Sequence, residues 1–232
     1  MKRFWTRASA EPTPSGFAIL LDGRPMRLPG GAILHVRLEK LAREIAAEWQ
    51  AAGEEVSFAD TPLTGLAGNA QERIAPDPYP TIDAIARYGE SDLLCYRAET
   101  PEKLVDRQAA SWQPWLDWAE AAHGAPLRIT SGVAPIRQHR SSIAALREAV
   151  SRHDPYALAA LGVAVPALGS LVLGLALAEG RLGASEAFAL GALDELFQAE
   201  LWGEDAEAAA RRTSVAADVA LAERMLRLVG GS

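Results

Sequence analysis

The sequence has few cysteines and no excess of basic charge. Among its 232 residues there is one cysteine, Cys95, so no disulfide can form within the chain and an oxidising compartment is not implied. The formal net charge is -7, whereas proteins that bind nucleic acids present concentrated basic surface. We therefore expect an ordinary globular protein with no nucleic-acid partner.

The motifs that usually carry catalysis are also missing. There is no Gly-x-x-x-x-Gly-Lys-Ser/Thr phosphate loop, no Gly-x-Gly-x-x-Gly after a strand and no Gly-x-Ser-x-Gly turn. The four histidines lack the spacing of metal ligands, and one cysteine cannot form a zinc-binding pair. We expect no catalytic residue, no cofactor and no metal, and hence a protein that is not an enzyme.

One long uncharged segment, residues 155–178, raises the question of a membrane span. Its length is roughly that needed to cross a bilayer. Pro166 interrupts it, however, and Gly162, Gly169 and Gly174 allow close approach of neighbouring backbones. We expect two packed core helices separated at Pro166 and no membrane insertion. A membrane-associated protein is the alternative.

The pattern of apolar residues predicts an α+β fold. We expect an N-terminal domain of short antiparallel strands with helices at 1–103 and a C-terminal all-helical domain at 104–232. Residues 17–21 read as a strand, Asp22-Gly23-Arg24 as a hairpin turn and residues 25–28 as the returning strand. The other elements predicted for this part are strands at 33–36 and 93–96 and helices at 38–52, 62–74 and 81–89. The helices predicted further on cover 101–124 with a kink or division at Pro114, then 141–152, 155–161, 166–179, 184–198 and 206–228.

Tryptophans mark the predicted core. Three of the six lie on the helix after Pro101, where residues at three-to-four spacing form one buried face: Leu104, Gln108, Trp112, Leu116 and Ala119. Large aromatic side chains on helices serve packing or partner contact. We predict four structural anchors: Trp49, Trp112, Trp118 and Trp202.

Acidic residues gather after Leu193 in a predicted helix. At about 100° per residue most of them fall on solvated faces. Asp194 differs, because it lies at the edge of an apolar stripe formed by Leu193, Phe197 and Leu201. We predict that Asp194, Glu195, Phe197 and Leu201 form a partner-binding site.

Short motifs spread along the chain resemble those of an assembly chaperone of the F-type ATP synthase. They are Arg3-Phe4-Trp5, Leu21-Asp22-Gly23-Arg24-Pro25-Met26-Arg27-Leu28-Pro29, Leu41-Ala42, Ile45-Ala46, Glu48-Trp49, Leu94-Cys95-Tyr96-Arg97, Trp112-x-Pro114, Trp118-Ala119, Leu193-Asp194-Glu195-x-Phe197-Gln198 and Trp202-Gly203. The resembled member protects the free alpha subunit before the catalytic hexamer closes. An acid at the position of Asp194, usually glutamate, is tied to function in that family.

The resemblance implies an ATP-independent chaperone that binds the unassembled alpha subunit and prevents its aggregation until it pairs with beta. We expect a monomer without a cofactor. Eukaryotic members are mitochondrial, and this sequence has neither a secretory signal nor room for a presequence, so we expect a bacterial cytoplasmic protein. The alternative from another class is an enzyme with a fold-assembled acid/base site around Asp194, Glu195 and the basic cluster Arg137-Gln138-His139-Arg140.

Overall fold

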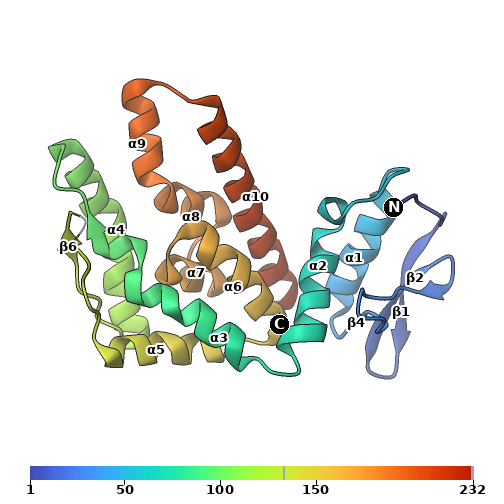
Figure 1. Ribbon diagram of the computed structural model, residues 1–232. Helices are drawn as coiled ribbons and strands as arrows, with labels where there is room; N and C mark the ends of the chain where they lie inside the picture. The colour runs from blue at the N-terminus through green and yellow to red at the C-terminus, as the bar shows by residue number, and fades with distance from the viewer. Residues whose placement is uncertain (133, 231–232) are drawn as a thin grey trace. The chain divides into compact units, whose positions relative to one another are not determined.

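The chain divides into two compact units in the computed structural model, which describes residues 1–132 and 134–230 (Figure 1). The first unit contains Met1–Pro78, Pro155–Ala160 and the described residues from Arg224 onward. The second contains Tyr79–Asp154 and Leu161–Glu223. The α+β class is confirmed, with most strand residues near the N-terminus. These units divide after Pro78, so a domain boundary at 103/104 stays a prediction.

A four-stranded antiparallel sheet organises the first unit. Its strands are β1 (Ala8–Thr13), β2 (Gly16–Leu21), β3 (Arg24–Pro25) and β4 (His35–Val36). Strand β2 pairs with each of the other three. Asp22 and Gly23 form the predicted turn with φ angles of 48° and 78°, as a two-residue hairpin turn requires. The Asp22 carboxylate accepts hydrogen bonds from the backbone N–H groups of Thr6 and Arg7, which fixes the preceding segment.

The helices of the first unit are joined by a buried carboxylate. They are α1 (Glu39–Ala51), a 3-10 turn (Phe58–Asp60), α2 (Pro62–Asn69) and a π-helical turn (Ala70–Ile74). Glu48 of α1 accepts hydrogen bonds from the N–H groups of Leu63 (3.0 Å) and Thr64 (3.3 Å), and so satisfies the start of α2. Burial raises the pKa of Glu48, and these two amide bonds oppose the shift. A carboxylate from one helix therefore fixes where the next begins.

Trp49 is held from three sides, as expected of a structural anchor. Its side chain is 9% exposed, and its Nε1–H donates to the Thr64 hydroxyl oxygen at 2.9 Å. The Trp5 ring lies 5.0 Å from the Trp49 ring, and Trp5 Nε1 donates to the Trp49 carbonyl at 3.0 Å. The N-terminal segment, α1 and α2 therefore meet at one indole.

We expect Trp49→Ala to act through stability. Truncating a buried tryptophan costs about 3–5 kcal/mol, so the melting temperature should fall by several degrees or more. Trp49→Phe keeps most of the ring and loses the bond to Thr64, so its loss should be clearly smaller. Thermal melts followed by circular dichroism measure both. An unchanged melt in Trp49→Ala, together with lost partner binding, would show that Trp49 is a contact residue instead.

The second unit consists mainly of helices, with one short strand ladder. Its elements are α3 (Tyr79–Ala86), the 3-10 turns η3 (Arg87–Ser91) and η4 (Leu93–Cys95), β5 (Tyr96–Arg97), α4 (Glu102–His123), β6 (Thr130–Ser131), α5 (Arg140–Ser151), α6 (Pro155–Leu168) from Leu161 onward, α7 (Leu171–Ala178), α8 (Ala184–Gly191), α9 (Leu193–Trp202) and α10 (Ala206–Val229) as far as Glu223. Strands β5 and β6 pair in parallel. The strand predicted at 93–96 is therefore mostly a 3-10 turn, and the predicted C-terminal part includes two strand residues.

Two prolines predicted to kink or interrupt helices lie inside them. Helix α4 continues through Pro114, and α6 continues through Pro166 to Leu168. A proline removes one N–H donor from a helix interior and is unfavourable there, but tertiary packing supplies most helical stability in proteins. Trp112, which precedes Pro114 by less than one turn, is fully buried. The break predicted at Pro166 comes instead at Gly169, whose φ is 63°.

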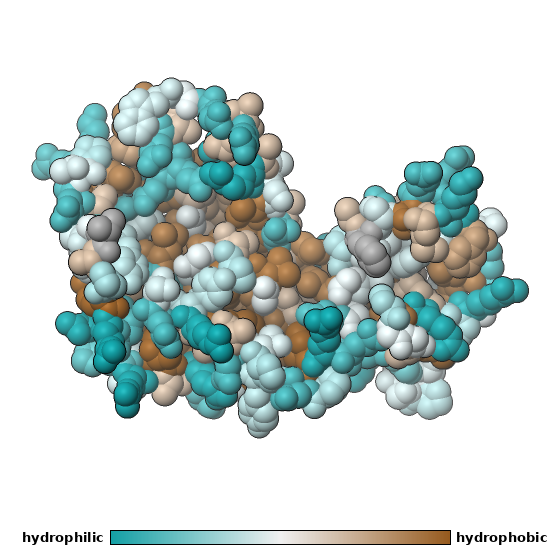
Figure 2. Space-filling model, in the orientation of Figure 1, coloured by the Kyte–Doolittle hydropathy of each residue, from teal (hydrophilic) through white to brown (hydrophobic). Residues whose placement is uncertain are grey.

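The uncharged segment from residue 155 to 178 forms α6 and α7. No helix in the described parts of the chain is long and apolar enough to cross a membrane. Figure 2 shows apolar surface (brown) near α6 and polar surface (teal) along α3, whereas residues 171–177 of α7 are buried. In α6, Gly162 and Pro166 are exposed, and Val163 and Ala167 are half-buried. The small residues predicted to allow close packing are therefore partly at the surface.

Asp92 organises the start of α7 from a fully buried position. Its carboxylate accepts hydrogen bonds from the Val172 N–H (3.0 Å), the Leu94 N–H (3.1 Å) and the Ser170 hydroxyl (2.8 Å). Ser170 Oγ in turn accepts the Leu173 N–H at 3.1 Å, as an N-cap residue does. Burial raises the pKa of Asp92 to about 6, against the opposing effect of these hydrogen bonds.

We expect the raised pKa of Asp92 to make stability depend on pH. The folded state binds this proton more tightly than the unfolded state, so the free energy of unfolding should fall as pH rises from about 4 to about 6. Asp92→Asn has no proton to lose. The stability of the wild type relative to Asp92→Asn should therefore decrease by roughly 2–3 kcal/mol from pH 4.5 to pH 7. Denaturant unfolding at several pH values measures it; a difference independent of pH would mean that the hydrogen bonds keep Asp92 ionised throughout.

Candidate partner-binding site

Helix α9 carries all four predicted partner-binding residues, and two apolar side chains of its first half are buried. Leu193 and Phe197 are each 5% exposed and lie one turn apart on the buried face. Asp194 is half-buried, whereas Glu195 and Leu201 are exposed. The predicted stripe therefore fixes the start of the helix and leaves its end open to solvent.

The Asp194 carboxylate is partly used within the chain. Its Oδ1 accepts a 2.7 Å hydrogen bond from Nε2 of Gln108, which is 1% exposed. Gln108 Oε1 accepts a hydrogen bond from the backbone N–H of Ala98 at 2.7 Å. The side-chain amide of Gln108 on α4 therefore joins Ala98 and Asp194. No hydrogen bond to Asp194 Oδ2 exists among the described residues. That oxygen can accept a hydrogen bond from a partner.

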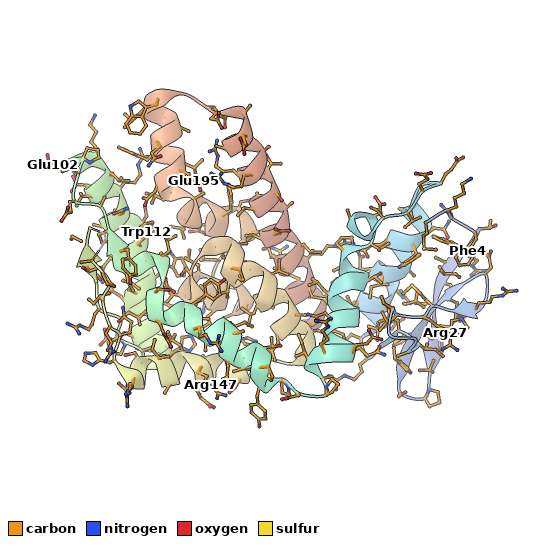
Figure 3. All side chains as sticks on the ribbon, viewed as in Figure 1. Phe4, Arg27, Glu102, Trp112, Arg147 and Glu195 are labelled. Carbon is orange, nitrogen blue, oxygen red and sulfur yellow. The ribbon has the colours of Figure 1, made fainter. Side chains whose placement is uncertain are left out.

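Arg97 holds the backbone of Gln108 in place. The Arg97 guanidinium donates to the carbonyls of Leu94 (2.9 Å) and Gln108 (2.8 Å), and its carbon lies 5.4 Å from the centre of the Trp112 ring. Burial lowers the pKa of Arg97. Trp112 points from α4 into the unit (Figure 3), and its Nε1–H donates to the Leu190 carbonyl at 3.0 Å. Trp112 is therefore fixed by burial and a hydrogen bond, and its role as a structural anchor stays a prediction.

Phe197 is covered by an ion pair. The Arg107 guanidinium forms two hydrogen bonds with the Glu200 carboxylate, at 2.8 and 2.9 Å, and its carbon lies 5.1 Å from the centre of the Phe197 ring. The prediction that Phe197 contacts a partner does not fit its burial. Its ring packs inside the unit, and Arg107 and Glu200 occupy the surface above it.

Glu195 faces α10 and is paired there (Figure 3). Its carboxylate lies 3.2 Å from Arg211 and 3.9 Å from Arg212, and Arg212 also pairs with Glu204 at 2.7 Å. Surface ion pairs are worth at most about 1 kcal/mol, so a partner cation can compete for the exposed Glu195. Glu195 is positioned for contact, but its charge is already balanced.

The end of α9 presents two large apolar side chains. Leu201 is 53% exposed and Trp202 is 79% exposed. The prediction that Trp202 is a structural anchor is wrong, since an anchor must be buried. Trp202 lies five residues beyond Phe197. At 100° per residue, its side chain is therefore rotated about 140° from the buried face. Trp118 is half-buried and lies 6.2 Å from the Trp115 ring.

The supporting residues Arg97, Arg107 and Gln108 were not predicted as part of the site. A signal existed only for Gln108, a polar residue on the predicted buried face of its helix, because a buried amide requires hydrogen-bond partners. Neither Asp194 nor Glu195 forms a hydrogen bond or ion pair with the cluster 137–140 among the described residues. The described residues also contain no group of three or more metal-binding side chains.

Comparison with known proteins identifies the family. Residues 2–120 match the ATP12 chaperone protein family. The crystal structure of Atp12 from Paracoccus denitrificans has a TM-score of 0.93 and 44% sequence identity, covering 98% of this chain and 97% of that one. A variant of that protein with aspartate replaced by lysine gives a TM-score of 0.92 with the same identity and coverage. The mitochondrial protein atp12 of Schizosaccharomyces pombe is 28% identical over 214 residues, covering 87% of this chain and 74% of the relative.

Sequence and fold together place this chain among the chaperones of ATP synthase assembly. It belongs to the ATP12 chaperone family. The resemblance inferred from the sequence motifs is thereby confirmed at the level of the family.

We expect substitutions of Asp194 to separate its internal role from its external one. Asp194→Asn keeps an oxygen acceptor for Gln108 and should lower stability by less than about 1 kcal/mol. Asp194→Lys replaces the acceptor by a donor and leaves a buried amide unsatisfied, which should cost about 1–3 kcal/mol. Partner binding by folded Asp194→Lys should be weaker still, because like charges across an interface are unfavourable.

Thermal unfolding and a binding assay on the same samples distinguish the two roles. A melt of Asp194→Lys equal to that of the wild type would contradict the importance of the Gln108 bond. Wild-type affinity in folded Asp194→Lys would instead remove Asp194 from the partner-binding site.

Proposed function

We propose that the protein binds the unassembled alpha subunit of the F-type ATP synthase, without ATP, and prevents its aggregation until it pairs with the beta subunit. The observation that carries this proposal is the similarity to Atp12 over nearly the whole chain. Subunits of a ring expose apolar interfaces before their neighbours arrive, and such surfaces aggregate. A binding protein that covers them needs neither catalysis nor a cofactor. We propose that it acts as a monomer in the bacterial cytoplasm.

We further propose that the end of α9 contacts the client. Exposed tryptophans are enriched among residues that dominate binding energy, and Trp202 is 79% exposed beside the exposed Leu201. Nearby in sequence are the carboxylates of Glu200, Glu204 and Asp205. Glu200 and Glu204 pair with Arg107 and Arg212, so a basic group of the client would compete with these arginines for them. The free oxygen of Asp194 adds an acceptor at the other end of the helix.

ATP independence has its own support in the sequence. The chain contains no Gly-x-x-x-x-Gly-Lys-Ser/Thr loop, whose backbone N–H groups and lysine cradle phosphates in one large class of ATP-binding proteins. Release by competition with the beta subunit requires only that the chaperone bind less tightly than the true neighbour.

Light scattering of alpha subunit during refolding tests this function. Stoichiometric protein should suppress scattering in the absence of nucleotide. Trp202→Ala should bind alpha subunit at least about tenfold more weakly with an unchanged melting temperature, because its side chain is exposed. Tyr79→Ala is a matched control, since Tyr79 is a 63% exposed aromatic residue of the same unit.

The possible failures have different meanings. Absence of suppression by the wild type, or a strict requirement for ATP, would contradict the proposed function. Equal binding by Trp202→Ala and Tyr79→Ala would retain the function and place the contact elsewhere.

A further inference from the structure

A large cavity in the first unit has no role in the site on α9. Its volume is about 730 Å³, within the range of roughly 300–1,000 Å³ typical of ligand sites. Met26, Leu28, Trp49 and Val56 supply apolar walls, and α2 forms one side. Trp49, whose indole N–H is satisfied by Thr64, presents only apolar surface there. The cavity is therefore suited to an apolar group.

Two glycines of α2 face this cavity, and packing explains only one of them. A glycine within a helix is less stable than alanine by about 1 kcal/mol. At Gly68 an added Cβ would lie 2.8 Å from Leu28 Cδ2, so any larger residue there would require the buried Leu28 side chain to shift. At Gly65 an added Cβ would meet no atom within 4 Å. Nothing inside the described chain requires glycine at residue 65, which suits close approach by a separate molecule.

Two arginines on the cavity wall have no carboxylate partner in the described chain. Thr61, which also lines the cavity, does not cap α2 with its side chain. Arg27 donates to the Gly31 carbonyl, and no described carboxylate lies within ion-pair distance of Arg27 or Arg73. Two guanidinium groups without a described ion-pair partner, against the single carboxylate of Glu72 in the same lining, favour an acidic ligand.

We propose that this cavity receives an apolar side chain of the client, on a segment whose backbone crosses α2 at Gly65 and whose neighbouring carboxylate pairs with Arg27 or Arg73. The inference rests on the proposed function and deepens it, because it gives the client a second contact of different chemistry. The contact at α9 offers carboxylates to a basic group of the client, whereas the cavity offers guanidinium groups to an acid. The occupant is a segment with an apolar residue flanked by aspartate or glutamate.

Gly65→Leu tests the proposal by filling the cavity from its own wall. The open space at Gly65 accepts the new side chain, and the gain in helix propensity should keep the melting temperature at or above that of the wild type. Binding to purified alpha subunit should weaken at least about tenfold, which is about 1.4 kcal/mol. Gly162→Leu is the matched control, because Gly162 is also helical and its added Cβ would also meet no atom within 4 Å. This control should bind as the wild type does.

Two substitutions of Arg73 test whether a carboxylate of the client segment pairs with it. They do not require the fold to tolerate leucine at residue 65. Arg73→Glu, at an exposed position, should weaken binding about tenfold, and Arg73→Lys should retain most of it. A dye probes the cavity without the client: anilinonaphthalene sulfonate, an apolar anion, should bind the wild type. It should bind Gly65→Leu at least tenfold more weakly, and alpha subunit should displace it.

The outcomes separate this inference from the proposed function. If the wild type and Gly162→Leu bind alpha subunit, and folded Gly65→Leu and Arg73→Glu bind it equally well, the inference is overturned and the function stands. Dye bound in the cavity but not displaced by alpha subunit also overturns it, and would indicate a small-molecule site. If the wild type fails to bind alpha subunit at all, the proposed function and this inference fail together.

Discussion

The buried amide of Gln108 is the interaction on which the second unit's site depends. One side chain, 1% exposed, accepts a hydrogen bond from Ala98 and donates one to Asp194, and so joins α4 to α9 and to the residue that follows β5. Leaving either end of a buried amide unsatisfied costs about 1–3 kcal/mol, so the three segments are fixed together. Arg97 adds two hydrogen bonds to backbone carbonyls and stacks near Trp112. The arrangement of α9 thus follows from polar groups as much as from apolar packing.

This constraint divides α9 into two halves with different properties. The first half is held by Leu193, Phe197 and the Asp194 bond, and Arg107 with Glu200 covers Phe197 from outside. The second half ends at Trp202 with two exposed apolar side chains. A rigid base with an exposed aromatic end loses little conformational entropy on binding, and preorganisation of this kind raises affinity without enlarging the interface. Asp194 therefore serves the site partly by holding the helix that presents it.

Local sequence patterns predicted those parts of the fold that depend on interactions between residues close in sequence. The Asp22-Gly23 turn and the apolar period of α1 predicted β2, β3 and α1, and the order of short motifs predicted the family. Strand β1 was not predicted because Glu11 and Pro12 break its alternation; pairing with β2 stabilises it. The hydrogen bond from Gln108 to Asp194 joins residues 86 positions apart, which no local pattern encodes. Trp202 was misassigned because the sequence shows that the residue is aromatic but not whether it is buried. It does not show that the end of the helix extends past the residues that would cover it.

The two contact chemistries together explain how a holding protein can bind an exposed subunit interface and still release it. We propose two contacts, one at the exposed Trp202 of α9 and one at the apolar cavity beside Arg27 and Arg73. When one molecule engages both, the second contact forms at high effective concentration, and the combined affinity exceeds that of either one. Displacing either contact removes that advantage, so a competing subunit needs to cover only part of the interface to start release. A chaperone built on two separate weak contacts can therefore let go without hydrolysing a nucleotide.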